Sequence, residues 1–373
     1  MGIYEELGVK RIINGAATLT AIGGSIMPPE VLDSMKEASQ SYVSIIELQH
    51  KAGAQIAKWT NNEAAMVSNG AAAGMVLATA ACIAGDDEEK RRQLPHTDGM
   101  KNEVVVYGPQ RVGYDFAIRQ AGGKIVEYGS PDGATREELE AAITDKTAAI
   151  FVFYFEHRMD KQLPLEEVVE IGHNRGIPVI VDAAAQLPRR ENLWRFTRDL
   201  GADLAIFSGG KGLRGPQSSG LVVGKKWLVD LMISFSCPNA GIGRPFKVGK
   251  EEIVGLMTAV KLYMEKDMEA EMACWEAQVQ SVIDAFKDES AVCAIRDFPS
   301  EAGQPMPRAK VSLDQDAFSA DVREIDNWLK EGEPSIYLAT IGDAFYINPQ
   351  TLMPGEIDIV IERLKEAIDK YKK

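Results

Sequence analysis

The sequence predicts an α/β fold: a large, mostly parallel, doubly wound sheet domain followed by a small α+β domain at the C-terminus. Short apolar runs alternate with helical patterns between residues 64 and 224, as in chains whose parallel strands are joined by crossover helices. Glycines or polar residues follow most of these runs directly, and parallel sheets bind ligands beyond the carboxyl ends of their strands. Residues 291–373 show further strand patterns and a last helix, but no catalytic motif.

The composition is that of a globular protein with room for a large core. The chain has 373 residues, of which 45% are hydrophobic and 26% charged. A formal net charge of −14 disfavours a nucleic-acid partner, which would need a clustered basic face. The four cysteines and four histidines show no metal-ligand spacing, so we expect no metal and reduced thiols in the cytoplasm. No apolar run is long enough to span a membrane, and the start lacks a secretory signal pattern.

Residues 1–45 are expected to form an N-terminal arm and a helix. Residues 11–20 are typical of a short strand or extended arm, and the prolines at 28 and 29 suit the first turn of a helix that continues to about residue 41. A second helix, ending near Trp59, opens the large domain, which we place at residues 46–255. Residues 256–373 then form a long helix and the small C-terminal domain.

A strand at 64–68 runs into the small-residue turn Asn69–Gly74 and a helix to about Ala84. A strand, a glycine turn and a helix start make an anion site, because free N–H groups and the helix dipole point at one spot. A plain tight turn with a closely packed helix explains the same residues equally well. Residues 85–102 are charged and polar, which predicts a surface loop.

Further strands and helices follow in alternation. A capping box, Thr135 with Glu138, starts one of the helices. The last strand of the large domain is expected to be antiparallel or at an edge. The predicted strands cover 104–108, 124–129, 148–155, 177–182, 204–208 and 221–224, and the helices 135–143 and 165–174. In the C-terminal part we expect a long amphipathic helix from 248 to 275 and onward, strands at 309–313, 335–338 and 344–348, and a helix over 355–371.

Lys211 is the residue around which the chemistry is predicted. It lies among glycines, in Ser208–Gly215, directly after a strand, and Asp182 ends an earlier strand. Glycines there permit close backbone approach and unusual dihedrals. A pyridoxal phosphate enzyme needs this pair, because the lysine forms a Schiff base and the aspartate keeps the ring nitrogen protonated. The competing interpretations are a surface lysine in a loop and an aspartate that caps the segment beginning at Ala183.

Other strand-end residues are candidates for the same site. The Ser208 hydroxyl is expected to reach the cofactor phosphate, or else to make a strand-end hydrogen bond, and the Ala184 methyl to lie against the ring. Gln110 or His157 would flank the ring, and Arg111 or Arg158 would suit an anionic substrate group. For each of these, and for Gln186, an ordinary surface or core role is equally compatible with the sequence.

The residues resemble a known family. Residues 208–226 resemble the cofactor-lysine segment of selenocysteine synthases (L-seryl-tRNA selenium transferases) and their relatives, which include D-glucosaminate-6-phosphate ammonia-lyase. Residues 11–16 resemble the family's N-terminal Arg-x-Ile-Asn-x arm. Residues 47–53 and 241–252 are similar to the ammonia-lyase-like branch in particular.

The resemblance implies the fold-type I architecture of pyridoxal phosphate transferases, in a homodimer or larger homo-oligomer with active sites at subunit interfaces. It implies that Lys211 holds the cofactor and that Asp182 pairs with its ring nitrogen. The phosphate would be bound by Ser68, Gly70, Ala71 and Ser208, while Glu47, His50 and Arg244 would enter the neighbouring subunit's site.

Two departures from the family pattern bear on the substrate. Selenocysteine synthases carry an additional N-terminal tRNA-binding domain, whereas this sequence starts almost at the arm, which with the acidic charge argues against a tRNA substrate. In addition, Leu338 follows Ile336-Tyr337 where an arginine is expected, so the specificity is expected to differ from that of the sugar-acid enzyme.

The predicted activity is an α,β-elimination that turns a small β-hydroxy amino acid, or a phosphorylated amino-sugar acid, into a 2-keto acid and ammonia. Arg111, Arg158 and Arg244 are the candidates for binding its carboxylate or phosphate. Two alternatives stay open: an aldolase or racemase, which shares the carbanion chemistry at Cα, and a homologue that binds the cofactor without turnover.

Overall fold

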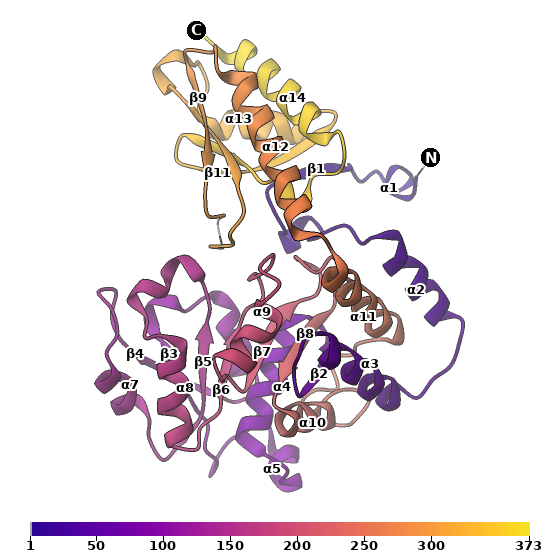
Figure 1. Ribbon diagram of the computed structural model, residues 1–373, viewed down its shortest axis with the longest axis vertical. Helices are drawn as coiled ribbons and strands as arrows, with labels where there is room; N and C mark the ends of the chain where they lie inside the picture. The colour runs from indigo at the N-terminus through magenta and orange to yellow at the C-terminus, as the bar shows by residue number, and fades with distance from the viewer. Residues whose placement is uncertain (1, 301) are drawn as a thin grey trace. The chain divides into compact units, whose positions relative to one another are not determined.

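A computed structural model describes residues 2–300 and 302–373, and these residues form two compact units (Figure 1). The larger unit comprises residues 27–266 and 302–304, and the smaller unit comprises residues 2–26, 267–300 and 305–373. The domain boundaries expected at 45/46 and 255/256 stay a prediction. None of the helices in the described ranges is both long and apolar enough to cross a membrane.

The larger unit contains a seven-stranded sheet in the order β2-β8-β7-β6-β5-β3-β4. Strand β8 runs antiparallel to both of its neighbours, and the other pairings are parallel. The sequence predicted that the last strand of the large domain, β8, would be antiparallel or at an edge. It is antiparallel, but it lies between β2 and β7 and not at an edge. The strands are β2 (Ala64–Ser68), β3 (Glu103–Tyr107), β4 (Lys124–Tyr128), β5 (Thr147–Phe153), β6 (Val179–Asp182), β7 (Leu204–Ser208) and β8 (Gly220–Gly224).

Helices connect these strands, and the sequence did not reveal those at residues 88–93, 116–120, 192–194 and 226–235. Residues 85–102 were expected to be a loop, but they contain a short helix whose first turn is capped by the Asp87 carboxylate. The capping box of Thr135 and Glu138 is confirmed. The helices of the larger unit are α2 (Pro29–Ser39), α3 (Ile45–Trp59), α4 (Gly70–Ala84), α5 (Glu88–Gln93), α6 (Phe116–Gln120), α7 (Arg136–Ala142), α8 (Leu165–Asn174), α9 (Asn192–Trp194), α10 (Lys226–Phe235) and α11 (Lys250–Glu265).

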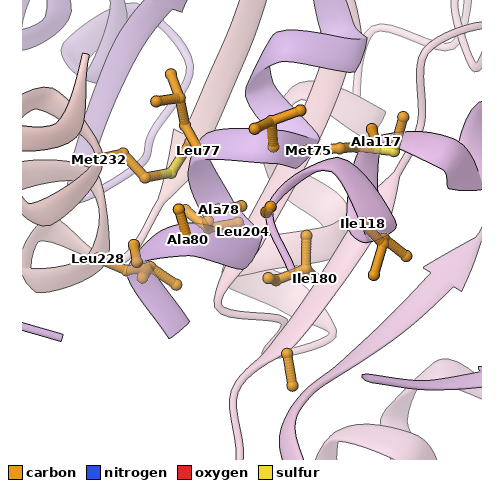
Figure 2. Close-up of a cluster of buried hydrophobic side chains, with 14 of the residues drawn as sticks. Met75, Leu77, Ala78, Ala80, Ala117, Ile118, Ile180, Leu204, Leu228 and Met232 are labelled. Carbon is orange, nitrogen blue, oxygen red and sulfur yellow. The ribbon is translucent and has the colours of Figure 1, made fainter. Parts of the chain in front are cut away.

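Helix α4 lies at the centre of the main core of this unit. Its small residues allow close packing, and most of its length is buried. Figure 2 shows its side chains meeting those of α6, α10 and the strands β6 and β7. Alternate strand residues point to this core, for example Ile180 and Ile206, while their neighbours Val181 and Ala205 are buried on the other face. Burial on both faces is what the apolar strands predict for a doubly wound sheet.

The smaller unit is an α+β structure with a five-stranded sheet in the order β1-β11-β12-β10-β9. The N-terminal arm supplies β1, which pairs in parallel with β11. The sequence did not reveal β9 or α13. The elements are α1 (Ile3–Glu6), β1 (Ile12–Gly15), α12 (Met268–Phe286), β9 (Val292–Asp297), β10 (Arg308–Leu313), α13 (Val322–Glu331), β11 (Ser335–Ile341), β12 (Ala344–Ile347) and α14 (Glu356–Tyr371).

The expected single helix from residue 248 to 275 is wrong. Helix α11 ends at Glu265, Lys266 is extended, and α12 begins at Met268. The break has a local cause, because the Asp267 carboxylate accepts hydrogen bonds from the backbone N–H groups of Glu269 (3.1 Å) and Ala270 (3.0 Å). Such an N-cap stabilises a new helix start by about 1 kcal/mol.

Candidate active site

The strand register brings three predicted residues to one edge and one face of the large sheet. Gly220, the first residue of β8, pairs with Ser68 on one side and Ser208 on the other. Asp182 pairs with Ile206, which lies two residues before Ser208 and therefore on the same face. This is the face that α4 covers, since Ile206 belongs to the α4 core. The two serines and the aspartate therefore share the carboxyl edge of one sheet face.

The N-terminus of α4 begins at the same edge, two residues after Ser68. Gly70 has a φ of +78°, which favours glycine. Asn69 occupies the N-cap position but makes no side-chain cap hydrogen bond, and its Nδ2 donates to the Lys247 carbonyl (3.0 Å). The first-turn N–H groups therefore lack a capping side chain from Asn69, which suits an anion at this helix start.

The glycines that flank Lys211 are required by space rather than by dihedral angle. A Cβ on Gly210 would lie 2.6 Å from Gln217 Cα, and one on Gly212 would lie 2.8 Å from Leu187 Cβ. The residue of this loop with a left-handed φ is Arg214 (+55°), whereas Gly210 and Gly212 have ordinary φ values. Close approach of the backbone is thus confirmed as their role, and the expected unusual dihedrals are wrong for these glycines.

Asp182 is buried, and the positive charge of Lys211 acts on its carboxyl group. Burial raises the pKa of the Asp182 carboxyl, while the Ala184 N–H and the positive charge of Lys211 lower it. The Oδ1 atom accepts the Ala184 N–H at 3.1 Å, and the Ala184 carbonyl in turn accepts the Ser208 N–H at 3.3 Å. The carboxylate therefore makes the local turn bond that a capping role predicts, and it also lies within electrostatic reach of the lysine.

Further candidate residues follow three strands of the large sheet. Gln110 follows β3, His157 and Arg158 follow β5, and Gln186 follows β6. Gln110 is buried, and its Nε2 donates to the Arg158 carbonyl at 2.9 Å. Gln186 is also buried, and the side-chain oxygens of both glutamines have no hydrogen-bond partner among the described residues. Each of these two glutamines thus keeps an acceptor available to a ligand or a water molecule.

Arg111 is neutralised by two carboxylates. Its Nε donates to Asp115 Oδ2 at 2.7 Å, and its Nη1 binds Glu127. These bonds raise the pKa of the guanidinium. Because both partners already take up its charge, Arg111 is less suited to an anionic substrate than the sequence indicated.

His50 and Arg244 lie apart from the hydrogen bonds described above. His50 is exposed on α3, and Arg244 is exposed with its Nη1 3.5 Å from Cys237 Sγ. Within the described parts of the chain, no hydrogen bond joins either residue to the strand-end residues. That Glu47, His50 and Arg244 enter a neighbouring subunit's site stays a prediction.

Sequence reasoning missed two features of this region. A Cβ on Gly74 would lie 3.0 Å from Ile206 Cγ2 and 3.3 Å from Ser68 Oγ, so this glycine lets α4 approach the sheet beside Ser68. The segment 302–304 lies against His157, Gln186 and Leu187. A helical glycine could have been suspected from the sequence, but nothing local in the sequence links residues more than 100 positions apart.

Comparison with solved structures defines the class of this fold. A structure of D-glucosaminate-6-phosphate ammonia-lyase matches with a TM-score of 0.88 and 31% identity, covering 99% of both chains. A structure of serine palmitoyltransferase (SPT) with pyridoxal phosphate matches with a TM-score of 0.59 and 14% identity, covering 96% of this chain and 88% of the other. The chain has the fold-type I architecture of pyridoxal phosphate enzymes, which confirms the expected fold class.

The sequence comparisons identify the family within that class. The family model of L-seryl-tRNA selenium transferase matches residues 11–275, and the chain belongs to this family. The D-glucosaminate-6-phosphate ammonia lyase of Salmonella typhimurium is 32% identical over 98% of each chain. The 5'-C-glycyluridine monooxygenase-decarboxylase of a Streptomyces species is also 32% identical, over 98% of this chain and 92% of its own.

Proposed function

We propose that this protein is a pyridoxal-phosphate-dependent ammonia-lyase that converts a small β-hydroxy amino acid, or a phosphorylated amino-sugar acid, into a 2-keto acid and ammonia. The observation that carries the proposal is the full-length similarity to D-glucosaminate-6-phosphate ammonia lyase in both sequence and structure. The substrate that we propose is a small molecule, like the one for which the ammonia lyase relative is named. The cytoplasmic location stays a prediction.

The residues present fit the cofactor. A buried carboxylate such as Asp182 needs a positively charged or N–H partner, which a pyridine ring nitrogen supplies. Lys211 would hold the cofactor covalently, while Ala184 and Gln110 would border its ring. The phosphate would lie at the α4 start, held by Ser68, Gly70, Ala71 and Ser208.

When bound, pyridoxal phosphate supplies a ring that accepts the electron pair left at Cα when the α-proton departs. The buried Asp182 carboxylate would keep the ring nitrogen protonated and so favour this transfer of charge. Lys211 Nζ, once it is free of the cofactor, would take the proton from Cα as a general base. The β-hydroxyl would leave as water, taking up a proton such as the one that Lys211 removed from Cα. The enamine that is released would tautomerise to an imine, and its hydrolysis by one water would give the 2-keto acid and ammonia.

The products distinguish this proposal from its rivals. We expect one ammonia and one 2-keto acid for each phosphorylated amino-sugar acid or β-hydroxy amino acid consumed by the cofactor-loaded protein. Release of an aldehyde, or inversion at Cα, would instead indicate an aldolase or racemase. Consumption of O₂ with release of CO₂ would indicate a reaction like that named for the Streptomyces relative. Cofactor binding with no change in any amine tested would indicate a non-catalytic homologue.

Gly220→Ala is predicted to weaken cofactor binding. A Cβ at Gly220 would lie 2.4 Å from Gly70 C and 2.6 Å from Ser68 Oγ, so the alanine must displace the turn that leads into α4. Because Ser68 and Gly70 would both lose their contacts with the phosphate, the Kd of the cofactor should rise by about 10-fold or more. Fluorescence titration measures this Kd. Gly113→Ala is the matched control, because nothing lies within 4 Å of its added Cβ. Equal Kd values for the two variants would contradict the placement of the phosphate.

We also propose that the chain assembles with itself through residues 32–46. Large apolar side chains are exposed along this stretch, namely Leu32, Tyr42, Val43 and Ile46, and Tyr42 is fully exposed. Exposed apolar patches of this kind mark interfaces, and a second copy of the chain is the partner that the family resemblance implies.

The oligomer is expected to dissociate when this stretch is made polar. Light scattering should give a mass of at least two chains for the wild type, and Val43→Asp with Ile46→Asp should raise the dissociation constant by about 10-fold or more. Ile341→Asp, at another exposed apolar residue, serves as the control. A wild-type monomer, or equal loss of mass in the control, would overturn this proposal.

A further inference from the structure

A short segment of the chain, Ala302–Gln304, is bound to the residues that follow β6. We call it the strap. It belongs to the larger unit, although the chain on both sides of it belongs to the smaller one. Gln186 Nε2 donates to the Ala302 carbonyl (3.2 Å), and Gln304 Nε2 donates to the Leu187 carbonyl (2.8 Å). Gln304 is buried, so this second bond is shielded from water.

The strap also lies directly against His157, at the end of β5. Gly303 has a φ of +76°, and a Cβ there would lie 2.4 Å from His157 Nδ1 and 2.7 Å from the His157 backbone N. Only glycine fits both the dihedral angle and the space. The Nδ1 side of the His157 ring therefore faces the strap.

The contacts of His157 determine which nitrogen carries its proton. Arg158 Nε–H donates to His157 Nε2 at 3.1 Å, so Nε2 is an acceptor without a proton. Burial and the charge of Arg158 lower the pKa of His157, and a hydrogen bond to the Ala302 backbone opposes this by favouring the protonated ring. The lowered pKa favours the neutral ring, and because Nε2 accepts from Arg158, the proton of the neutral ring belongs on Nδ1, the side that faces the strap.

Arg158 is held by this histidine but has no carboxylate partner. Its guanidinium carbon lies 5.4 Å from the centre of the Phe155 ring, which it covers. In the described parts of the chain no acidic side chain forms a salt bridge with it, whereas Arg189 pairs with Glu156 at 2.8 Å and Arg111 pairs with two carboxylates. With Nε bonded to His157, the Nη1 and Nη2 donors of Arg158 are left for an anion, which such a fork binds through two parallel hydrogen bonds.

We propose that Arg158 binds the anionic group of the substrate that is distant from Cα, and that the strap is a positioning element that holds His157 and, through it, Arg158. This inference rests on the proposed function and narrows the substrate class to amino acids with a distal phosphate or carboxylate. Arg158 is exposed, whereas Asp182, beside which Cα must react, is buried. Arg158 follows β5, the strand that pairs with β6 and so lies beside Asp182. An exposed arginine at this strand end is placed for the part of a substrate that extends away from Cα toward solvent.

The role of Arg158 is tested with an amino-sugar acid in phosphorylated and unphosphorylated form. Arg158→Gln should raise KM for the phosphorylated form by about 10- to 100-fold and leave KM for the other form within about twofold. Arg158→Lys, which keeps the charge but not the fork, should fall between. Equal increases for both substrates would overturn the assignment to a distal anion.

The role of the strap is tested with a pair of glycines. Gly303→Ala should raise KM for the phosphorylated substrate by about 3- to 10-fold with kcat nearly unchanged. Nitrogen-15 NMR of the cofactor-loaded enzyme should show His157 protonated at Nδ1 in the wild type and altered in Gly303→Ala. Gly342→Ala carries a similar strain, with a φ of +63°, but its Cβ meets nothing within 4 Å, and it should change neither readout. An unchanged His157 signal in Gly303→Ala would overturn the strap proposal.

A measurement without turnover separates this inference from the proposed function. Calorimetric titration of the cofactor-loaded wild type with inorganic phosphate should show binding that Arg158→Gln weakens by about 10-fold or more. This result supports an anion site at Arg158 even if no ammonia is released from any substrate. Equal phosphate binding by the wild type and the variant would overturn the inference and leave the lyase proposal intact.

Discussion

Lys211→Ala is expected to lower kcat by about 10³- to 10⁴-fold, because the same amine holds the cofactor and moves the proton at Cα. Lys211→Arg should lose as much, since an arginine keeps the positive charge but cannot give up its proton at neutral pH. Steady-state release of ammonia and 2-keto acid measures the effect. The loop that carries Lys211 is fixed by close contacts of Gly210 and Gly212, so the alanine is expected to leave the fold intact.

Two comparisons make the Lys211 result specific. Lys226→Ala removes an exposed lysine whose partner is Asp230, and it should leave kcat within about twofold. A small primary amine added to Lys211→Ala should restore part of the rate, because it replaces the missing base. A Lys211→Ala enzyme that keeps more than about a tenth of the wild-type kcat would refute the assignment.

Asp182→Asn is expected to lower kcat by about 10²-fold or more while the cofactor still binds. The neutral amide can keep the hydrogen bond from the Ala184 N–H, but it cannot hold a proton on the cofactor ring nitrogen. Cofactor titration and single-turnover rates measure the two effects separately. Loss of cofactor binding with an unchanged rate in the bound fraction would show that Asp182 holds the cofactor without assisting the reaction.

The same substitution has a predicted effect on stability that depends on pH. Burial raises the pKa of Asp182 above its ordinary value of 3.8 in the cofactor-free fold. A raised carboxyl pKa contributes stability that is fully present below the unfolded pKa and is lost as the pH rises through the folded pKa. Above that range the wild type carries a buried charge, so cofactor-free Asp182→Asn should have the higher Tm.

Calorimetry with and without cofactor tests this pH dependence. In the cofactor-loaded protein the carboxylate gains a charged partner, so the advantage of Asp182→Asn should disappear or reverse. A cofactor-free Asp182→Asn protein that melts below the wild type at neutral pH would show that the chain itself already neutralises Asp182.

Most of the sheet could be predicted from the sequence, because fully buried parallel strands are short apolar runs between turn signals. The elements that were missed are those decided by single residues or by packing. Asp267 breaks the expected long helix with one cap, and Asp87 starts a short helix in a charged stretch. The strand β9 begins with the short apolar run Val292–Ile295, but most of its residues are at least partly exposed, so it lacks the fully buried pattern of the strands in the larger unit.

The positions of several candidate residues at strand ends could be predicted from the sequence, but the contacts of these residues could not. Ser68, Asp182 and Ser208 were expected at strand ends, and the common partner Gly220 places both serines at one edge. The ion pairs of Arg111 depend on Glu127 from the neighbouring strand β4, which no local pattern indicates. The strap is more distant still, since its partners lie over 100 residues away in the sequence.

The most direct test of the account is to locate the cofactor on the chain. Reduction of the cofactor-loaded protein with borohydride turns the link between lysine and cofactor into a stable amine, and mass spectrometry of the peptides then finds the modified residue. The account predicts one labelled peptide, the one that contains Lys211, and no label in Lys211→Ala. A label on another lysine of the wild type, or none in a protein saturated with cofactor, would contradict it.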